Sequence, residues 1–538
     1  MEHMIRDSLF ITHLVAALIL SLLLPLVVVA QTEDFAEILR QQLASEEVAW
    51  AEQELAWAQL REFYAPHYRP VWFNEQGLSA RARHWRQTLR AAEVDGLDPE
   101  RYHLSNIEQY WAASMPVQQV WLELLLTDAF FHYSIHLRNG RLDPVAIDPN
   151  WHIDTAEVNA VSLLRNTLAA ESFAEALHDL PPPHLGYQQL REALGDYRAL
   201  AKVEDWPVLP LKPKLYWGMW HDNVRLLRRR LVLSGDLLPT PVLEARFFDQ
   251  SLKQAVERFQ LRHGLKVDGV MGAATVASMN TPISEHIKQI KLNMERWRWL
   301  PRQLDRRYIM VNTASYRLHV IDKQKPRLAM RVITGTPERP TPVVGGVLRN
   351  LIINPYWFVP KKIALEDLIP KQLRDPDFFK TKHIRVLSSL ARDAQELDPS
   401  DIDWSKLTPD NFPYVLRQDP GPANSLGTIK FPFLNNFAIY LHDTPQQQLF
   451  KQSSRAFSSG CIRVEQPLQL ARYLLNGEQG WSLAKLQEKI ATGESLTIRL
   501  PKPISIYLVY WTVWVGADKA VYFQKDIYGR DRPMADCH

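Results

Sequence analysis

The sequence predicts an α+β protein of several domains, and three observations support this fold class. The chain has 538 residues, which is too long for one ordinary domain. From Thr32 to about Asp205 the apolar residues recur at helical spacing, as at Leu55, Leu60 and Phe63. After Pro301 the pattern changes to short runs that are typical of strands.

These changes of pattern divide the chain into six segments. We expect a leader or anchor, a helical domain, a small helical domain, a helix with a linker, a mainly β domain and a tail. Their ranges are 1–30, 31–245, 246–282, 283–304, 305–515 and 516–538. Residues from about 360 to 418 are polar and rich in Pro and Asp, so they predict an insertion that caps the β core.

The first thirty residues differ from the rest of the chain. Phe10 to Ala30 is almost unbroken apolar sequence, preceded by Arg6, and Val28-Val29-Ala30 suits cleavage of a signal peptide after Ala30. The stretch is also long enough to anchor an uncleaved chain in a bilayer. Both alternatives place the remainder of the chain outside the cytoplasm.

Three helices follow from capping and stop signals. Val120 to Leu137 is an amphipathic run that ends at Asn139-Gly140. Asp249 is the expected N-cap of a helix that ends at Gly264. Ser284 to Leu300 forms a third helix, which Pro301 ends.

The β domain is expected to consist of short strands and one helix. The helix is Pro467 to Leu475, with proline at its start. The strands are expected at 308–312, 316–321, 328–333, 347–353, 428–431, 437–441, 504–515 and 520–523.

Charge and motif content exclude several classes of function. The formal charge is only +3, so the chain has no strong basic field and no nucleic-acid partner is expected. No CxxC or HExxH motif occurs, and we expect neither a metal nor a cofactor. His132 and His136 have the spacing of a metal pair, but no supporting carboxylate is evident in the sequence.

The chain has only two cysteines, Cys461 and Cys537, and Cys461 carries the chemical prediction. His442 follows an expected strand, and Cys461 lies 19 residues later (461 − 442) beside Gly460. A nearby imidazole and a cation such as Arg463 are expected to lower the pKa of the thiol. The amides of Gly460 and Cys461 could then hold an oxyanion. On spacing alone, the alternative is a histidine and an inert cysteine that never meet.

Two segments resemble known families. The segment from Phe248 to Asn280, FDQSLKQAVERFQLRHGLKVDGVMGAATVASMN, resembles a helical peptidoglycan-binding domain. The segment YLHDTPQQQLFKQSSRAFSSGCIRVEQP resembles the signature of the L,D-transpeptidase catalytic domain. The large Gram-negative type is also similar in its further motifs, NMERW from Asn293, NPYW from Asn354 and DIYGRD from Asp526.

The L,D-transpeptidase resemblance implies a peptidoglycan-crosslinking acyltransferase of the periplasm, a target of carbapenems. It implies that Cys461 is the nucleophile and that His442 is the general acid and base. It also implies that the Gly460 backbone binds the oxyanion and that Arg463 orients the substrate or the Cys461 loop. Asp443 is expected to point away from His442, because successive strand residues face opposite sides, so a backbone carbonyl should orient the imidazole. Tyr440, Trp357 and Ser459 are candidate substrate-binding residues. Many shorter members of the family have histidine at the position of Ser459.

The resemblance implies peptidoglycan stem peptides as the partner, with other wall-synthesis proteins or the inner membrane as further contacts. Three alternatives remain open from the sequence. One is an L,D-carboxypeptidase, in which water replaces the acceptor amine. Another is a non-catalytic scaffold that only binds the wall, and the third is a cysteine protease with the same dyad.

Overall fold

The computed structural model describes residues 35–44, 55–65, 67–203, 206–391, 393–475 and 480–537. The chain forms two compact units, one of residues up to 141 with 155–195 and 294–302, and one of 142–154, 196–293 and 303 onward. The expected leader or anchor, 1–30, lies outside the described residues. Among the described helices, none combines the length and hydropathy needed to cross a bilayer.

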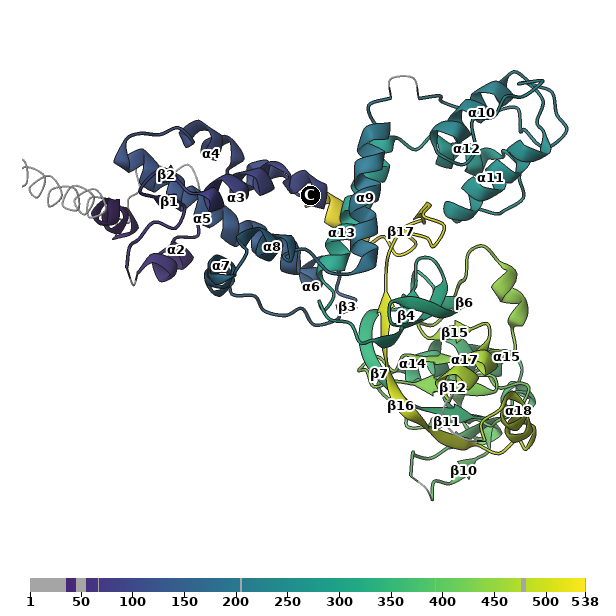
Figure 1. Ribbon diagram of the computed structural model, residues 1–538. Coiled ribbons are helices and arrows are strands. Elements are labelled where there is room, and N and C mark those ends of the chain that lie inside the picture. Colours follow the sequence, from purple (N-terminus) through teal and green to yellow (C-terminus); the bar gives the residue numbers. More distant parts are fainter. Residues whose placement is uncertain are drawn as a thin grey trace, which may run out of the picture. The chain divides into compact units, whose positions relative to one another are not determined.

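The first unit is helical and is built around α5 (Pro116–Asn139). The helices α2 (Trp57–Tyr64), α4 (Leu104–Tyr110) and α7 (Ala160–Ala169) pack against it (Figure 1). The sequence predicted an amphipathic helix here, but every residue from Val120 to Phe131 is buried. Neighbouring helices cover both its faces, so the prediction was wrong about its environment. Glu123 is one of two buried acidic residues in this stretch. Its carboxylate accepts hydrogen bonds from the Val71 and Trp72 amides and the Tyr64 hydroxyl.

A small helical domain opens the second unit. It consists of α10 (Asn223–Leu233), α11 (Gln250–Arg262) and α12 (Ala273–Met279), around a shared apolar core (Figure 1). The Asp249 side chain accepts the Leu252 amide at 2.8 Å, which confirms the predicted N-cap. Gly264 follows the helix with φ +61°, a conformation that favours glycine.

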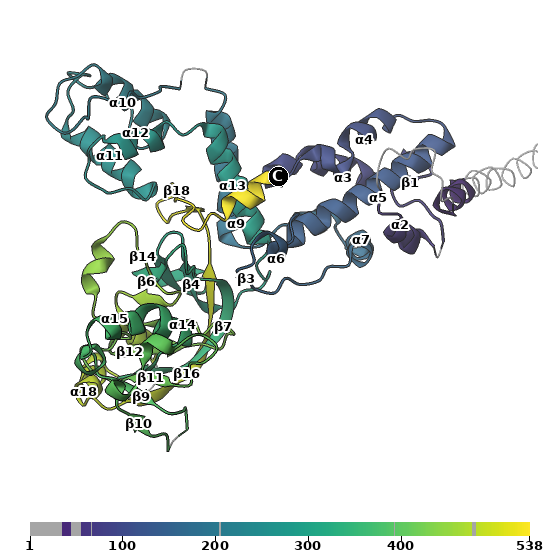
Figure 2. The same ribbon diagram turned by 180° about the vertical axis from the view of Figure 1, so that it is seen from behind.

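The β domain is one large sheet, in the strand order β12-β13-β15-β6-β5-β4-β16-β7-β3. β12 also pairs with β7, so the sheet closes on itself. β7 and β16 run side by side through the domain in both views (Figures 1 and 2). The strands, in chain order, are β3 (Trp151–His152), β4 (Arg307–Asn312), β5 (Arg317–Asp322), β6 (Lys325–Gly335), β7 (Val343–Ile353), β12 (Ile429–Pro432), β13 (Tyr440–His442), β15 (Ile462–Val464) and β16 (Leu496–Val509).

The segment between β7 and β12 has an architecture of its own. Four short strands form a separate sheet in the order β10-β9-β11-β8, with bounds Glu396–Leu397, Ile384–Leu387, Val415–Gln418 and Trp357–Phe358. Helices α14 (Lys361–Ile363), α15 (Ile369–Arg374) and α16 (Phe378–Thr381) accompany it. Its apolar core contains Trp357, Phe379 and Trp404, although the sequence showed only a polar segment without regular alternation.

Two further elements differ from the prediction. The strand expected at 437–441 is only β13, because the Asn435 side chain holds the amides of Phe437 and Ile439 in a turn and Ala438 has φ +53°. The C-terminal segment contains β17 (Val513–Val515), β18 (Val521–Phe523) and a helix, α19 (Asp531–Asp536), that its polar composition did not indicate.

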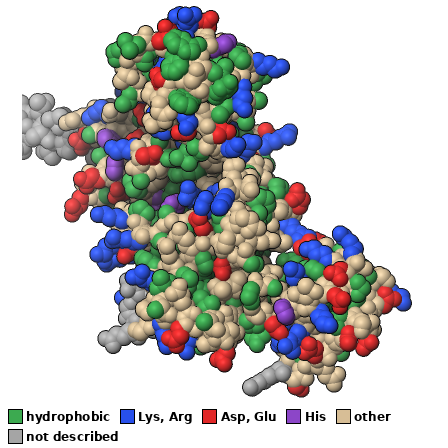
Figure 3. Space-filling view, turned by 90° about the vertical axis from the view of Figure 1, so that its right-hand side faces the viewer, with side chains coloured by type: hydrophobic (Ala, Val, Ile, Leu, Met, Phe, Trp, Pro, Cys, Tyr) green, Lys and Arg blue, Asp and Glu red, His purple; other side chains and the backbone are tan. Residues whose placement is uncertain are grey.

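The face of the molecule drawn in Figure 3 has no dominant charge. On the face drawn in Figure 3, lysine and arginine side chains are interspersed with acidic ones, in keeping with the formal charge of +3. Local charge therefore depends on individual clusters.

Candidate active site

The strand register places three polar residues abreast. Lys430 of β12 pairs with His442 of β13, and His442 pairs with Arg463 of β15. Paired residues on adjacent strands point to the same face of a sheet, so the imidazole lies between two cations. Cys461 immediately precedes β15 and lines a cavity of about 520 Å³ together with His442 and Arg463.

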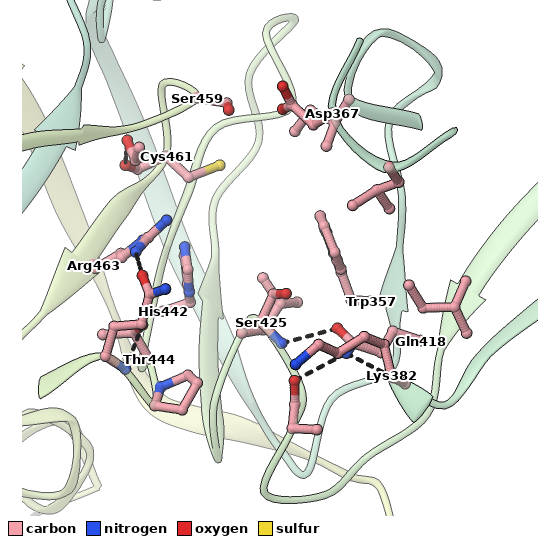
Figure 4. A pocket seen from close by; sticks show the side chains of 18 of the residues that line it. Trp357, Asp367, Lys382, Gln418, Ser425, His442, Thr444, Ser459, Cys461 and Arg463 are labelled. Carbon is pink, nitrogen blue, oxygen red and sulfur yellow. Dashed lines mark hydrogen bonds between the residues drawn. The ribbon is translucent and has the colours of Figure 1, made fainter. Parts of the chain in front are cut away.

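The Cys461 sulfur points into this cavity (Figure 4). The thiol lies 3.7 Å from the Ala438 carbonyl oxygen, to which it donates. Burial raises the thiol pKa, while the Tyr440 amide and hydroxyl and the charges of Lys430 and Arg463 oppose the shift. The sequence predicted a lowered pKa, and this was wrong because the cost of burying a thiolate outweighs the effect of the cations.

His442 is a buried, neutral imidazole. Its Nδ1 lies 2.5 Å from the Asp443 carbonyl oxygen. A carbonyl can only accept, so Nδ1 is assigned the proton and Nε2 is left as the base. Burial first, and then Arg463 and Lys430, lower the pKa of His442 to about 3.

The prediction about Asp443 is confirmed. One carboxylate oxygen accepts the amide and hydroxyl of Thr428, and the other accepts the Thr444 amide at 2.7 Å. The backbone carbonyl of Asp443, and not its carboxylate, orients His442. In the described structure Cys461 and His442 line one cavity but share no hydrogen bond.

Gly460 shapes the turn that presents Cys461. Its φ is +112°, which L side chains rarely adopt, and a Cβ here would lie 3.1 Å from the Ile439 Cδ1. Its amide donates to the Ser458 hydroxyl at 3.2 Å, so in this structure it is engaged within the turn and not free for an oxyanion. The Thr341 hydroxyl donates to the Gly460 carbonyl at 2.7 Å and fixes the other side of the peptide unit.

The C-terminal motif supports this turn from behind. The Tyr528 hydroxyl donates to the Gly335 carbonyl at 2.8 Å, and the Gly335 amide donates to the Thr341 hydroxyl. Arg530 donates to the Thr341 carbonyl at 3.1 Å. Tyr528 and Arg530 thus support the backbone around Thr341, whose hydroxyl in turn binds the Gly460 carbonyl.

All three predicted substrate-binding residues line the cavity. Trp357 comes from the insertion and is labelled across the cavity from Cys461 in Figure 4. Tyr440 lies on β13, and burial raises the pKa of its hydroxyl. The Ser459 hydroxyl accepts a hydrogen bond from Arg339, which also forms ion pairs with Glu366 and Asp367 of the insertion.

Only part of the Arg463 guanidinium is hydrogen-bonded within the described structure. Its Nη1 donates to the Gln446 side chain at 2.7 Å, a bond drawn in Figure 4. Its Nε is buried and has no hydrogen-bond partner within the described structure. An unsatisfied guanidinium nitrogen beside a cavity suits an anionic group on a ligand.

Lys430 is the residue that the sequence did not single out. Its Nζ lies 3.9 Å from the centroid of the Tyr440 ring, a cation–π contact, and burial lowers its pKa. A lysine within a short, otherwise apolar strand was the available signal. Its meaning depends on the pairing of β12 with β13, which the sequence does not display.

The His132 and His136 pair has separate partners. His132 lies 3.5 Å from a carboxylate oxygen of Asp128, four residues earlier on α5, so the expectation of no supporting carboxylate was wrong. His136 Nδ1 shares a 3.0 Å hydrogen bond with the Tyr102 hydroxyl. Over the described residues, no cluster of three or more His, Cys, Asp or Glu side chains could hold a metal ion.

Three family models match the chain. Residues 58–194 match a scaffold domain, residues 221–279 match a "putative peptidoglycan binding domain", and residues 306–483 match the L,D-transpeptidase catalytic domain (YkuD). They account for the helical unit, the small helical domain and the β domain, and confirm the predicted α+β organisation.

A curated Haemophilus influenzae protein, described as "Putative L,D-transpeptidase", is 36% identical over 247 residues. The match covers 46% of this chain, and the chain spans about half (49%) of that relative's length.

Two solved structures are also similar. An L,D-transpeptidase from Xylanimonas cellulosilytica is 14% identical, over 56% of this chain and 99% of that one, with a TM-score of 0.18. A mutant Enterococcus faecium L,D-transpeptidase is 12% identical, over 39% and 52%, with a TM-score of 0.17. The assignment rests on the family models and the curated relative. Residues 306–483 therefore belong to the L,D-transpeptidase catalytic domain family.

Proposed function

We propose that this chain is a cysteine-dependent L,D-transpeptidase that crosslinks peptidoglycan through diaminopimelate residues. The observation that carries the proposal is the Cys461 sulfur facing a cavity beside a neutral, carbonyl-oriented His442, within a domain of this family. A nucleophile, a base and an orienting acceptor are the parts that acyl transfer needs.

In the first half-reaction, Cys461 attacks the carbonyl between the third and fourth residues of a donor tetrapeptide. His442 Nε2 takes the thiol proton and returns it to the departing D-alanine amine, which leaves a thioester. In the second half-reaction, the side-chain amine of diaminopimelate on a neighbouring stem attacks the thioester. His442 takes a proton from that amine and returns it to the Cys461 sulfur.

This chemistry requires two local changes, at the Cys461 thiol and at the Gly460 amide. Because Cys461 donates to the Ala438 carbonyl in the described state, the thiol must turn from that oxygen toward His442. The Gly460 amide reaches an oxyanion by exchanging its Ser458 bond for one to the substrate. Tyr440, Trp357 and Ser459 contact the donor stem from the cavity wall.

The charge of the cavity supports an acidic stem peptide as substrate. Lys371, Lys382 and Arg463 line it, against a single acidic residue, Asp367. We assign the unpartnered Nε of Arg463 to a substrate carboxylate. The apolar segment from Phe10 to Ala30 supports a periplasmic location, where this substrate is found.

The decisive test is incubation of the purified protein with disaccharide tetrapeptides that contain diaminopimelate, with products read by mass spectrometry. We expect dimers joined between diaminopimelate residues and one D-alanine released per link. Release of D-alanine without dimers would favour the carboxypeptidase, and no product at all would contradict both activities.

The two cysteines supply a matched control. Cys461→Ala should abolish dimer formation and Cys537→Ala should leave it unchanged, because only Cys461 lines the cavity. A carbapenem should add its mass to the parent protein and to Cys537→Ala, but not to Cys461→Ala. Crosslinking by Cys461→Ala would overturn the mechanism.

A further inference from the structure

A second cavity, of about 490 Å³, shares no lining residue with the Cys461 cavity. It lies within the second unit, between the end of α11 and the paired strands β5 and β6. Five of its lining residues are cationic, namely Lys266, Arg317, Arg331, Lys451 and Arg455. Of the lining residues that the structure describes, none is acidic. We call it the basic cavity.

The strand register concentrates this charge. Arg317 of β5 and Arg331 of β6 are directly paired across the two strands. Like charges directly opposite each other destabilise a sheet. Arg331 is compensated by an ion pair with Glu465. Arg317 and Lys451 form no ion pair with any described residue, and Glu465 acts on Arg317 only at longer range.

Arg455 adds a third guanidinium to the lining of the basic cavity. It is buried, and it donates to the backbone carbonyls of Val332, Gln452, Ser453 and Tyr316. Burial, followed by repulsion from Arg317 and Arg331, lowers the pKa of Arg455 to about 10. The fold therefore holds an arginine where neighbouring charges oppose it, an arrangement that a bound anion would relieve.

An aromatic surface borders the cations. Trp514 of β17 and Tyr522 of β18 both line the cavity, with ring centroids 5.2 Å apart and planes within 14°. Both side chains are half-buried, and the Tyr522 hydroxyl donates to Asp518. Partly exposed, stacked rings present an apolar face next to a polar rim, which suits the flat face of a sugar ring.

We propose that the basic cavity is a non-catalytic binding site for a carboxylate-bearing glycopeptide of peptidoglycan. The cations take stem-peptide carboxylates and the Trp514–Tyr522 pair takes a sugar. The choice of peptidoglycan rests on the proposed function, whereas the anionic and apolar character of the ligand follows from the cavity itself. The site holds wall material apart from the stem that reacts at Cys461.

The test measures binding of a fluorescently labelled disaccharide tetrapeptide to the full chain by anisotropy, in a Cys461→Ala background that prevents turnover. The Arg317→Glu/Lys451→Glu variant should bind at least about 10-fold more weakly, the scale for two charge contacts reversed. The matched control is Lys325→Glu/Arg327→Glu, which makes the same charge change at exposed positions of the β5–β6 hairpin outside the cavity. It should bind like the parent.

Arg317→Glu removes the repulsion with Arg331, so the Arg317→Glu/Lys451→Glu variant should melt no lower than its control, which separates binding from folding. A probe with amidated stem carboxylates should lose affinity for the parent to about the same extent as the variant does for the natural probe. Equal binding by the two double variants would overturn the proposal. Carbapenem adducts at Cys461 without charge-dependent binding would sink this inference alone. Charge-dependent binding without adducts would sink the proposed function alone.

Discussion

The two cavities of the second unit are nearly equal in volume, about 520 and 490 Å³, yet they treat charge in opposite ways. Around Cys461, burial lowers the pKa of His442 most, and Arg463 and Lys430, on the strands on either side, lower it further and keep the imidazole neutral. In the basic cavity, Arg317 and Lys451 are exposed and have no ion pair with the described residues. A buried cation shifts the pKa of a neighbouring group, whereas an exposed cation remains available to bind a ligand.

The two proposals place catalysis in the Cys461 cavity and retention of wall material in the basic cavity, and His442→Gln should separate the two cavities most strongly. Glutamine keeps a hydrogen-bonding side chain but cannot accept the thiol proton at neutral pH. The rate of carbapenem acylation should fall about 100-fold or more, the usual scale for a lost general base. Binding of the labelled disaccharide tetrapeptide should stay unchanged.

The control for this variant is His152→Gln, which changes an exposed histidine of β3 that does not line the cavity. Both rates are read from the growth of the adduct by intact mass spectrometry. Equal acylation by the two variants would show that His442 is not the base.

Gly460→Ala should have the next largest effect. The alanine must adopt φ +112° and place its Cβ against Ile439. This strain should lower the free energy of unfolding by about 1–3 kcal/mol, unless the turn relaxes and displaces Cys461. We expect acylation to slow roughly 10-fold to 100-fold, since small displacements of a nucleophile are costly. Denaturant unfolding and adduct kinetics measure the two parts.

Gly195→Ala is the matched control, because Gly195 lies in α9 (Leu185–Leu200) and its added Cβ meets nothing within 4 Å. That variant should be as stable as the parent or more so. If the two alanine variants behave alike, the turn at Gly460 does not depend on glycine.

Lys430→Met should give the smallest effect and sharpen the electrostatic half of the comparison. Lys430 lowers the pKa of Cys461 against the opposing effect of burial, so removing its charge raises that pKa further. The pH profile of iodoacetamide alkylation should move to higher pH, and the rate near neutrality should fall roughly 2-fold to 5-fold. The Cys461 adduct measured against pH gives the result.

Lys382→Met is its control, since Lys382 lines the same cavity but is exposed and is not among the groups that shift Cys461. An identical pH profile for Lys430→Met and the parent would mean that the cation–π contact with Tyr440 screens the charge of Lys430.

The sequence predicted those parts of the site that are local in the chain. Cys461, Gly460 and Arg463 are contiguous, and the alternation of strand residues was enough to exclude the Asp443 carboxylate. The N-cap at Asp249 was predicted for the same reason.

What the sequence did not predict depends on which strands pair. Lys430 acquires meaning only beside β13, and Arg317 faces Arg331 only because β5 pairs with β6 in that register. The raised pKa of Cys461 was missed because burial is a property of the assembled cavity. The apolar core of the insertion escaped notice because its residues are spaced irregularly among polar ones.

The support of Gly460 by Tyr528 and Arg530 bears on how this enzyme domain could be divided. The family match ends at residue 483, but β16, which pairs with both β4 and β7, begins at Leu496. The Tyr528 and Arg530 bonds that brace the Gly335 and Thr341 backbone lie later still. A fragment cut at the family boundary would lose a central strand and the hydrogen bonds that support the turn before Cys461. The smallest transplantable form of this domain therefore has to include residues up to at least Arg530.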